Sequence, residues 1–462
     1  MSGLALAAAF LLACPSVPAA QLGRGPYNPN EVVCEMLPGY DIGVVNATYG
    51  TTTKGHQNQT DCYLLGVPAG RDAESLAVEI AARPDVLFCG LNYYLDAPEG
   101  LQRSQPFLDA TLTGDYETQA AATTLNLPAV QPTSTGQGVR IALLDGGVNF
   151  SHPLFDSTDL ISVYDYVDLD SLANDEPGGS ASGHGTFVAG VLHLVAPEAS
   201  LCVYRVLDPT GRGTGYDVAS ALLHATDAGC KVANLSLGMT GIDPALDQAL
   251  AYAFTHGVFI AAAAGNDSTS DPEWFPVPAS SPTCVAVAAL DSVLRKADFS
   301  NYGPRIAFSA PGTRVYGPLL DSTYAWWDGT SFAAPFVSGT AAVVWAMDSA
   351  LSLDDVDSLM ARSAIAVDSL NPGLEGLLGH GLVNPAGCAQ LYRWSRGGDV
   401  NLDAAVSASD AICLVNCVFR GGELPLFTGS GDVDCDQALT AADIIYLVRY
   451  IFLSGEAPCG VL

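Results

Sequence analysis

Between residues 139 and 392, short and continuously apolar segments alternate with longer segments that have helical periodicity. The clearest apolar segments read VRIALLD, LCVYRVL, VANLSLG, GVFIAAAAG and CVAVAAL. A strand that is apolar on both faces is typical of a parallel sheet covered by helices on each side. The pattern therefore predicts an α/β domain with a doubly wound, mostly parallel sheet.

A smaller α+β unit is predicted before this domain. Residues 63–67 (YLLGV) are predicted to form a strand, residues 73–82 an amphipathic helix, and residues 86–89 (VLFC) a second strand. From residue 104 to residue 119 the chain is polar and has no clear period, which is typical of a linker or a processing region.

The first twenty residues contain an apolar run (LALAAAFLLA) that is too short to span a bilayer. The small residues VPA follow at positions 17–19, so residues 1–20 are predicted to be a secretory signal peptide. The segment Leu11–Cys14 (LLAC) also resembles a lipoprotein processing box, which would leave a lipid anchor on Cys14. Both alternatives place the mature protein outside the cytoplasm, either secreted or at the cell surface.

Composition narrows the range of partners. The chain has 462 residues, 49% of them apolar, so it can bury a large core and is not disordered throughout. Its net charge of −31 would repel nucleic acid and anionic membranes, whereas it suits divalent cations, above all calcium. No transmembrane segment is predicted, because residues 332–347 contain Pro335 and Ser338 and are better explained as a buried helix.

The twelve Cys residues are compatible with disulfides in an exported protein, and none has the CxxC…CxxC spacing of a zinc site. Cys435 and Cys459 could close a small loop near the C-terminus.

Four polar motifs interrupt the apolar segments of the α/β domain. DGG (145–147) follows a predicted strand, GHGT (183–186) opens a predicted helix, AAGN (263–266) follows another strand, and GTSFAAP (329–335) opens an Ala-rich helix. A serine hydroxyl becomes a nucleophile when a base takes its proton, and the base needs a carboxylate to fix its tautomer. An Asn side chain beside them can donate a hydrogen bond to a tetrahedral intermediate.

With these motifs in this order, residues 125–389 resemble the subtilases, the subtilisin-like serine peptidases. Further segments similar to the family are NLSLG (234–238), FSNYG (299–303) and APG (310–312). The resemblance implies protein or peptide substrates and hydrolysis through an acyl-enzyme. It assigns Asp145 to orient the base, His184 as the base, Ser331 as the nucleophile and Asn266 as the oxyanion donor. It also makes Ser236, Leu237 and Gly238 an edge that pairs with an extended substrate.

The chain departs from the family pattern at a few positions. Gly146 stands where the family usually has Ser or Thr, so we expect one hydrogen bond near Asp145 to be missing. Phe332 and Phe336 replace the more usual Met and His, and Met239 replaces a common Gly, so we expect a reshaped substrate cleft. No catalytic group is lost.

By resemblance, the first unit is similar to subtilase propeptides, which assist folding and inhibit the enzyme until they are cleaved. Cleavage is expected between Ala97 and Thr124, and an unrelated N-terminal domain is the alternative. The predicted order is a signal peptide (1–20), a propeptide-like unit (21–118), a peptidase domain (119–392), a linker (393–398) and a C-terminal repeat (399–462).

The C-terminal repeat is an internal duplication. DVNLD at residues 399–403 recurs as DVDCD at residues 432–436, and the same offset of 33 relates Phe419 to Phe452. Oxygen-bearing residues stand at loop positions 1, 3, 5, 9 and 12, which is the pattern of an EF-hand calcium loop followed by a helix. The predicted Ca²⁺ ligands are Asp399, Asn401, Asp403, Ser407 and Asp410 in the first loop, and Asp432, Asp434, Asp436, Thr440 and Asp443 in the second.

This tandem resembles a type I dockerin, which implies a cohesin-type scaffold as a partner. Position 6 of the loop, normally Gly, is Ala404 in one copy and Gln437 in the other, so weaker calcium binding is expected. A calcium-stabilised terminal cap and an acidic repeat without metal remain the alternatives. The whole sequence predicts a monomeric, calcium-associated serine endopeptidase made as a proenzyme; the rival prediction is a binding or scaffold protein whose peptidase domain is silent.

Overall fold

The structure is a computed structural model of the chain. It describes residues 25–99, 104–107, 115–241, 243–272, 274–395, 398–401, 405–420, 431–434 and 439–458.

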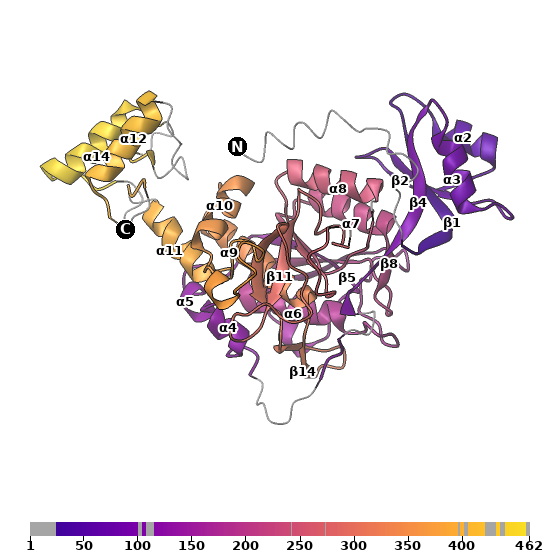
Figure 1. Ribbon diagram of the computed structural model, residues 1–462, viewed down its shortest axis with the longest axis horizontal. Coiled ribbons are helices and arrows are strands. Elements are labelled where there is room, and N and C mark those ends of the chain that lie inside the picture. Colours follow the sequence, from indigo (N-terminus) through magenta and orange to yellow (C-terminus); the bar gives the residue numbers. More distant parts are fainter. Residues whose placement is uncertain are drawn as a thin grey trace.

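The largest domain is built on a parallel sheet of seven strands in the order β12-β11-β10-β9-β5-β7-β6 (Figure 1). Crossovers between neighbouring strands make it doubly wound, which confirms the predicted α/β class. The five predicted apolar segments each contain a strand. The edge strands β6 and β12 were not predicted, and β6 is only half-buried. The strands are β5 (Arg140–Asp145), β6 (Leu160–Asp165), β7 (Ser200–Arg205), β9 (Val232–Leu235), β10 (Phe259–Ala263), β11 (Val285–Leu290) and β12 (Ile306–Pro311).

Helices cover both faces of this sheet (Figure 1). α6 (His184–Val195) packs against α9 (Thr330–Met347), and α9 crosses strands β9 to β12. α7 (Gly215–Asp227) and α8 (Pro244–Thr255) pack together and contact β5 and β10. Among the described residues, α9 alone has the length and apolarity to cross a membrane, and 89% of it is buried inside the protein.

Shorter elements complete the domain. The predicted linker region reaches β14, because Phe107 and Trp326 exchange both backbone hydrogen bonds, at 2.8 and 3.0 Å. The last helix of the domain continues three residues past the predicted boundary at residue 392. These elements are α4 (Ala120–Thr124), α5 (Leu127–Val130), 3₁₀ turns at Pro153–Phe155 and Asp368–Leu370, β13 (Val315–Pro318), β14 (Tyr324–Trp327), α10 (Leu353–Ser363) and α11 (Pro385–Ser395).

The first unit is an antiparallel sheet with two helices, as predicted for an α+β module. A disulfide joins Cys34 to Cys89, which face each other on β1 and β4. The sheet order is β2-β3-β1-β4-β8, so its last strand belongs to the large domain. The elements are β1 (Tyr27–Met36), α2 (Ile42–Tyr49), β2 (Thr52–Gln57), β3 (Cys62–Gly66), α3 (Ala73–Ala81), β4 (Val86–Asp96) and, from the large domain, β8 (Arg212–Thr214).

The two faces of this small sheet have different neighbours. One face, with Val32 among its residues, packs against the buried sides of α2 and α3. The other face, which includes Leu64, forms a cluster with Tyr216 of α7 and Ala245 of α8. Gln57 also donates a hydrogen bond to Ser220 Oγ at 2.8 Å. The first unit is therefore docked on the pair α7–α8 of the large domain.

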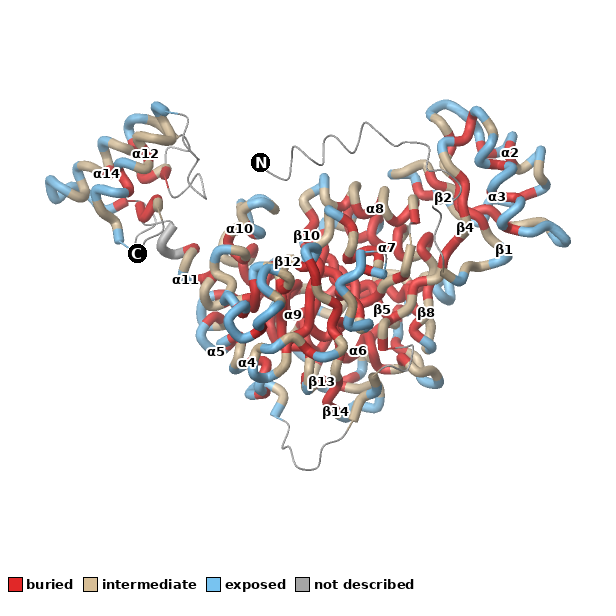
Figure 2. The backbone as a smooth tube through the Cα atoms, in the orientation of Figure 1, coloured by how far each residue is buried: buried red, intermediate tan, exposed pale blue. Residues whose placement is uncertain are grey.

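The C-terminal repeat forms a separate small core. α12 (Ala408–Arg420) and α14 (Ala441–Leu453) pack against each other, each following one predicted loop. Their buried contacts are duplicated, since Val400 and Leu414 of the first copy match Val433 and Leu447 of the second. In Figure 2 much of α12 and α14 is intermediate or exposed, and only short segments of the repeat are buried.

Candidate active site

Asp145 and His184 meet where the sheet joins its first covering helix. Asp145 is the last residue of β5 and His184 is the first residue of α6. Asp145 Oδ1 lies 2.7 Å from His184 Nδ1, and both side chains are completely buried. A carboxylate in this place holds the proton on Nδ1 and leaves Nε2 directed toward a reacting group.

The GHGT motif allows this contact because its second glycine lets the helix approach the strand. A Cβ on Gly185 would lie 2.1 Å from the carbonyl oxygen of Gly147, so only glycine fits. Asp175 fixes the start of the same helix: its carboxylate accepts hydrogen bonds from the Gly183 N–H at 3.0 Å and from the Thr186 hydroxyl at 2.6 Å. Burial raises the pKa of Asp175 to about 6, although these hydrogen bonds oppose the shift. No sequence motif indicated Asp175, because it lies outside all four of them.

Ser331 is the second residue of α9 and lies against the strand end after β9. Its carbonyl oxygen accepts a hydrogen bond from Ser236 Oγ at 2.7 Å, and its own Oγ lies 3.3 Å from the carbonyl oxygen of Ser236. At the start of a helix, the hydroxyl is near the positive end of the helix dipole, which favours developing negative charge. Pro335 lies in the second turn of α9, early in the helix, as expected.

The Asn266 side chain has a fixed orientation. Its Oδ1 accepts hydrogen bonds from the N–H and the hydroxyl of Thr330, at 3.0 and 2.8 Å. Because both donors face the oxygen, the amide Nδ2 must point the other way, into the site. Asn266 can therefore only donate toward the position beside Ser331.

A residue that the sequence analysis did not name joins these groups: Glu99. Its Oε2 accepts a hydrogen bond from Ser331 Oγ at 2.6 Å and lies 3.2 Å from His184 Nε2. Its Oε1 accepts a hydrogen bond from Asn266 Nδ2 at 2.8 Å. Ser331 and His184 thus contact the same oxygen. The only sequence signal for Glu99 was its position inside the range expected for propeptide cleavage, Ala97 to Thr124.

The backbone before Glu99 lies in the cleft as an added strand. Asp96 and Gly238 exchange two backbone hydrogen bonds of 3.0 Å, and the N–H of Ala97 donates to the carbonyl oxygen of Gly211 at 2.7 Å. On the other side, Leu95 faces Gly213 of β8. The edge predicted to pair with an extended chain is therefore paired with residues of the first unit.

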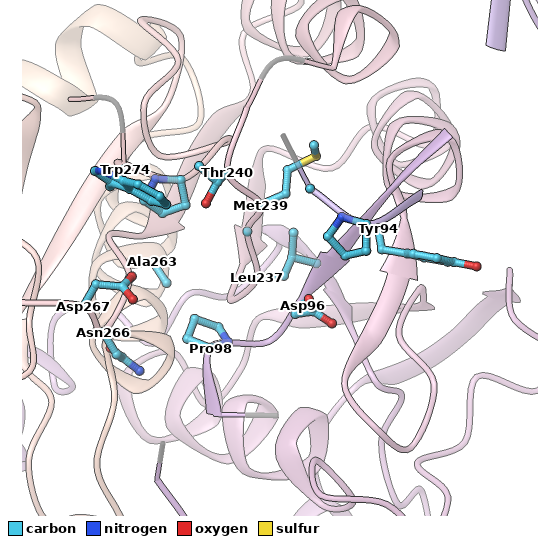
Figure 3. A pocket seen from close by; sticks show the side chains of 15 residues that line it. Tyr94, Asp96, Pro98, Leu237, Met239, Thr240, Ala263, Asn266, Asp267 and Trp274 are labelled. Atoms are coloured by element: carbon cyan, nitrogen blue, oxygen red, sulfur yellow. The ribbon is translucent and has the colours of Figure 1, made fainter. Parts of the chain in front are cut away.

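A cavity of about 310 Å³ opens beside this strand (Figure 3). Leu237, Met239, Asn266, Trp274 and Pro276 are among its lining residues, with Pro98 entering from the first unit. The expected influence of Met239 on the cleft fits its position here.

The other two departures act elsewhere. Phe332 and Phe336 are fully buried and are not among the residues that line this cavity. Phe332 packs instead against Phe187 and Trp327 and tilts against the His184 ring, with ring centroids 5.5 Å apart. These residues support the imidazole from behind.

As expected, Asp145 lacks one side-chain hydrogen bond. Its Oδ1 accepts from the Gly146 N–H at 2.7 Å, while its Oδ2 is buried without a hydrogen-bond partner among the described residues. The position of Gly146 thus leaves one carboxylate oxygen unsatisfied.

Two carboxylates surround the imidazole of His184. Burial alone would lower its pKa, but the negative charge and hydrogen bond of Asp145, and then those of Glu99, raise the pKa to about 10. With Glu99 in contact, His184 is therefore protonated at neutral pH and cannot accept a proton from Ser331.

Comparison with known proteins decides the family. Residues 136–381, more than half of the chain, match the subtilase family, peptidase S8. This chain belongs to the subtilase family. It is a subtilisin-like serine endopeptidase, a hydrolase.

Individual relatives cover the same region. Thermitase from Thermoactinomyces vulgaris is 35% identical over 251 residues, which are 52% of this chain and 84% of thermitase. Subtilisin DY from Bacillus licheniformis is 33% identical over 267 residues, which are 55% of this chain and 92% of that protein. The fold is similar to the crystal structure of fervidolysin from Fervidobacterium pennivorans, with a TM-score of 0.67 at 21% identity, over 81% of this chain and 64% of that one.

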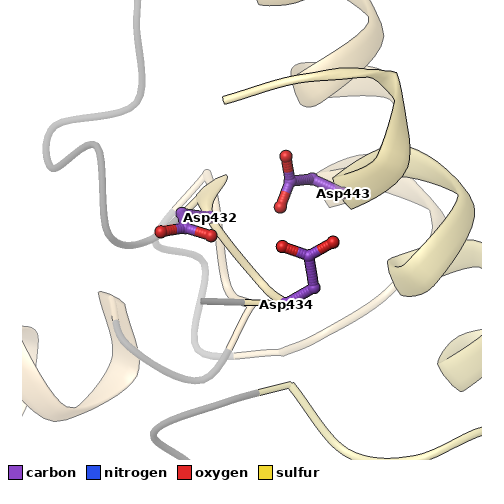
Figure 4. Close-up of side chains that lie close together, drawn as sticks. All are labelled: Asp432, Asp434 and Asp443. Atoms are coloured by element: carbon purple, nitrogen blue, oxygen red, sulfur yellow. The ribbon is translucent and has the colours of Figure 1, made fainter. Parts of the chain in front are cut away.

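In the C-terminal repeat of this subtilase, three of the residues predicted as Ca²⁺ ligands lie close together. Carboxylate oxygens of Asp432, Asp434 and Asp443 lie within 4.8 Å of one another (Figure 4). Asp443 accepts hydrogen bonds from the N–H groups of Val433 and Thr440, at 2.9 and 2.8 Å.

The first loop repeats the hydrogen bonds to its closing Asp. Asp410 accepts hydrogen bonds from the N–H groups of Val400 and Ser407, at 2.7 and 2.8 Å. Asp399 is buried at the start of the loop, and Asn401 also donates its N–H to Asp410. Four further predicted positions lie outside the described residues: Asp403, Asp436, Ala404 and Gln437. The suggested pair Cys435 and Cys459 lies outside them as well.

The raised pKa of His184 predicts a pH dependence of stability. Because the pKa is about 10 in the folded chain and about 6.5 when unfolded, the folded protein keeps a proton that the unfolded chain loses between these values. The resulting stabilisation is complete below pH 6.5 and is lost as the pH rises toward 10, by at most about 1.4 kcal/mol per pH unit. We expect urea unfolding of a Ser331→Ala chain to show this decline.

The matched control adds His184→Gln to the same chain, which removes the titrating group. We expect a shallower decline between pH 6.5 and 10. Equal slopes with and without His184 would contradict the prediction.

Proposed function

We propose that the protein is a secreted serine endopeptidase, made as a proenzyme, whose catalytic groups are Asp145, His184, Ser331 and Asn266. The observation that carries the proposal is that three of these side chains, from the starts of α6 and α9 and from the loop after β10, contact one carboxylate, while Asp145 binds Nδ1 of the imidazole. A substrate carbonyl in place of that carboxylate would meet the nucleophile, the base and an oxyanion donor together.

In this proposal, His184 Nε2 takes the proton of Ser331 Oγ as the oxygen attacks the peptide carbonyl. Asn266 Nδ2 donates to the oxygen that becomes negative. His184 then gives the proton to the leaving amine, and the C–N bond breaks to leave an acyl-enzyme. Water, activated through His184, releases the acid product. Asp145 keeps the imidazole in the required tautomer throughout.

Ser236, Leu237 and Gly238 would bind the substrate backbone by strand addition. The two hydrogen bonds between Asp96 and Gly238 support this role, because they show the backbone groups of the edge engaged by an extended chain. The opposite edge, β8, would hold the other side of the same substrate segment.

The first unit, residues 21–118, is proposed to be an inhibitory propeptide. Two observations support this: its sheet is docked on α7 and α8, and the end of its strand β4 occupies the substrate edge. A substrate cannot pair with Gly238 while Asp96 does.

The C-terminal repeat is proposed to bind two Ca²⁺ ions. Ca²⁺ prefers oxygen ligands, and the clustered carboxylates of Asp432, Asp434 and Asp443 are a fitting donor set. The same hydrogen bonds around Asp410 in the first copy support a second, equivalent site. Bound calcium would neutralise the clustered charges and hold each loop against its helix.

The repeat is also proposed to attach the enzyme to a cohesin-type scaffold. Its two helices expose large apolar side chains at positions related by the 33-residue offset, which would suit a partner surface. These residues, with their exposed fractions, are Ile412 (62%), Phe419 (66%), Ile445 (56%) and Phe452 (61%). A role as a calcium-stabilised cap alone would leave this duplicated apolar surface unexplained. Export through the signal peptide at residues 1–20, or a lipid anchor on Cys14, would bring the enzyme to such a scaffold.

Replacement of Ser331 tests the proposal. We expect Ser331→Ala to abolish peptide hydrolysis and to leave the precursor uncut, because no other group can form the acyl-enzyme. N-terminal sequencing of both proteins and covalent labelling by a fluorophosphonate provide the measurements. Normal processing of the variant, or failure of the processed wild-type protein to label, would favour a silent peptidase domain with a binding role.

Replacement of Asn266 tests the oxyanion donor. We expect Asn266→Ala to lower kcat about 100- to 1000-fold with little change in KM, because the lost hydrogen bond forms mainly in the transition state. Thr330→Ser is the matched control, since it keeps the hydroxyl that orients Asn266, and should leave kcat nearly unchanged. An effect of Asn266→Ala on KM alone would contradict the assigned role.

Calorimetric titration tests the calcium loops. We expect the metal-free full chain to bind Ca²⁺, and Asp443→Asn and Asp410→Asn each to weaken one site by about tenfold or more, because the residue closing the loop loses its charge. Asp354→Asn, an exposed acidic residue on α10, is the control. Unchanged titrations in both loop variants would exclude the loops as calcium sites, and titration of the calcium-loaded chain with a cohesin would test attachment.

A further inference from the structure

The side chain of Glu99 is enclosed among the catalytic groups. The residue has no exposed surface, and its carboxylate accepts hydrogen bonds from Ser331 Oγ and Asn266 Nδ2, with His184 Nε2 as its third neighbour. Hydrogen bonds to an ionised carboxylate are roughly twice as strong as those between neutral groups. All three groups that would act on a substrate are therefore engaged by one side chain.

The space that holds the carboxylate is built into the site. A Cβ on Gly329 would lie 1.9 Å from Glu99 Oε1, so the wall beside this oxygen is open only because residue 329 is glycine. Thr330 turns the Asn266 amide so that Nδ2 faces the same oxygen. The position thus suits an oxygen atom that carries negative charge.

The backbone delivers Glu99 to this position at the end of an anchored strand. Asp96 is paired with Gly238, and Ala97 is bonded to Gly211 on the opposite edge. Pro98 enters the neighbouring cavity. Because hydrogen bonds fix the backbone as far as Ala97, only one residue separates the fixed segment from Glu99, and its side chain has little freedom to leave the site.

The two carboxylate oxygens of Glu99 occupy the positions that the two carboxylate oxygens of a reaction product would occupy. In the acid product of peptide hydrolysis, one carboxylate oxygen derives from the substrate carbonyl and lies on the oxyanion donor. The other derives from water and lies between the nucleophile and the base. Here Oε1 occupies the first place, on Asn266, and Oε2 the second, between Ser331 and His184.

We propose that the Glu99 side chain is an internal product mimic that locks the precursor of this enzyme. It occupies the oxyanion position and engages the Ser331 proton, so a substrate carbonyl cannot enter. It also keeps His184 protonated, which removes the base. The lock is a side-chain carboxylate, and it requires no prior cleavage of the chain. This inference rests on the catalytic roles proposed above.

The test compares full-length precursors that carry Glu99→Gln or Glu99→Ala with wild type. Gln has nearly the same shape, but its amide offers one acceptor oxygen to three donors. The measurement is the rate at which a fluorophosphonate labels Ser331 in the uncut band, separated by electrophoresis from the processed band. We expect Ser331 in both variants to be labelled at least about tenfold faster than in wild type. The loss of all the charge-assisted hydrogen bonds would allow a larger increase.

Glu117→Gln is the matched control, because Glu117 is exposed and follows in the same chain segment; its precursor should label at the wild-type rate. Thermal unfolding of each precursor checks that the variants are folded. If folded Glu99→Gln and Glu99→Ala precursors label as slowly as wild type while processed enzyme labels rapidly, Glu99 is not the lock. If processed enzyme also fails to label, the proposed catalytic function is wrong and the inference falls with it.

Discussion

The contact between Asp145 and His184 imposes the tightest constraint on the peptidase domain. It joins the end of β5 to the start of α6, and it exists only because Gly185 lets the helix come close to Gly147. Asp175 secures the same helix end, and Phe332 supports the imidazole ring from α9. The strand β5 and the helices α6 and α9 are therefore positioned around one buried hydrogen bond. This explains why so many residues in this region are glycines or fully buried apolar residues.

The first unit and the peptidase domain share a strand system. β4 pairs with β1 inside the first unit and then with β8 and Gly238 of the peptidase domain. Strand β4 thus forms backbone hydrogen bonds to neighbours on both sides, first within the core of the first unit and then within the cleft of the peptidase domain. The substrate edge has its hydrogen-bonding groups satisfied by the chain itself, as buried backbone groups require.

Local patterns allowed much of this structure to be predicted. Strands buried on both faces appear as continuous apolar runs, so β5, β7, β9, β10 and β11 were found, and residues beside glycine at strand and helix ends revealed the four motifs. The half-buried strand β6 gave a weaker pattern. Glu99 and Asp175 could not be found because their partners are distant in sequence and no local pattern distinguishes them from surface acids. The link from Cys34 to Cys89 likewise depends on strand register, which only the folded sheet defines.

That disulfide has a mechanical consequence for the cleft. Cys89 lies seven positions before Asp96 on the strand that enters the substrate edge, and it is covalently tied to Cys34 on the neighbouring strand β1. Separation of this strand from its neighbours is thereby limited to the residues that follow Cys89, because the disulfide holds β4 against β1 at that point. In an oxidising compartment, residues 94–96 can therefore leave the substrate edge, but the separation cannot continue past Cys89 into the sheet of the first unit.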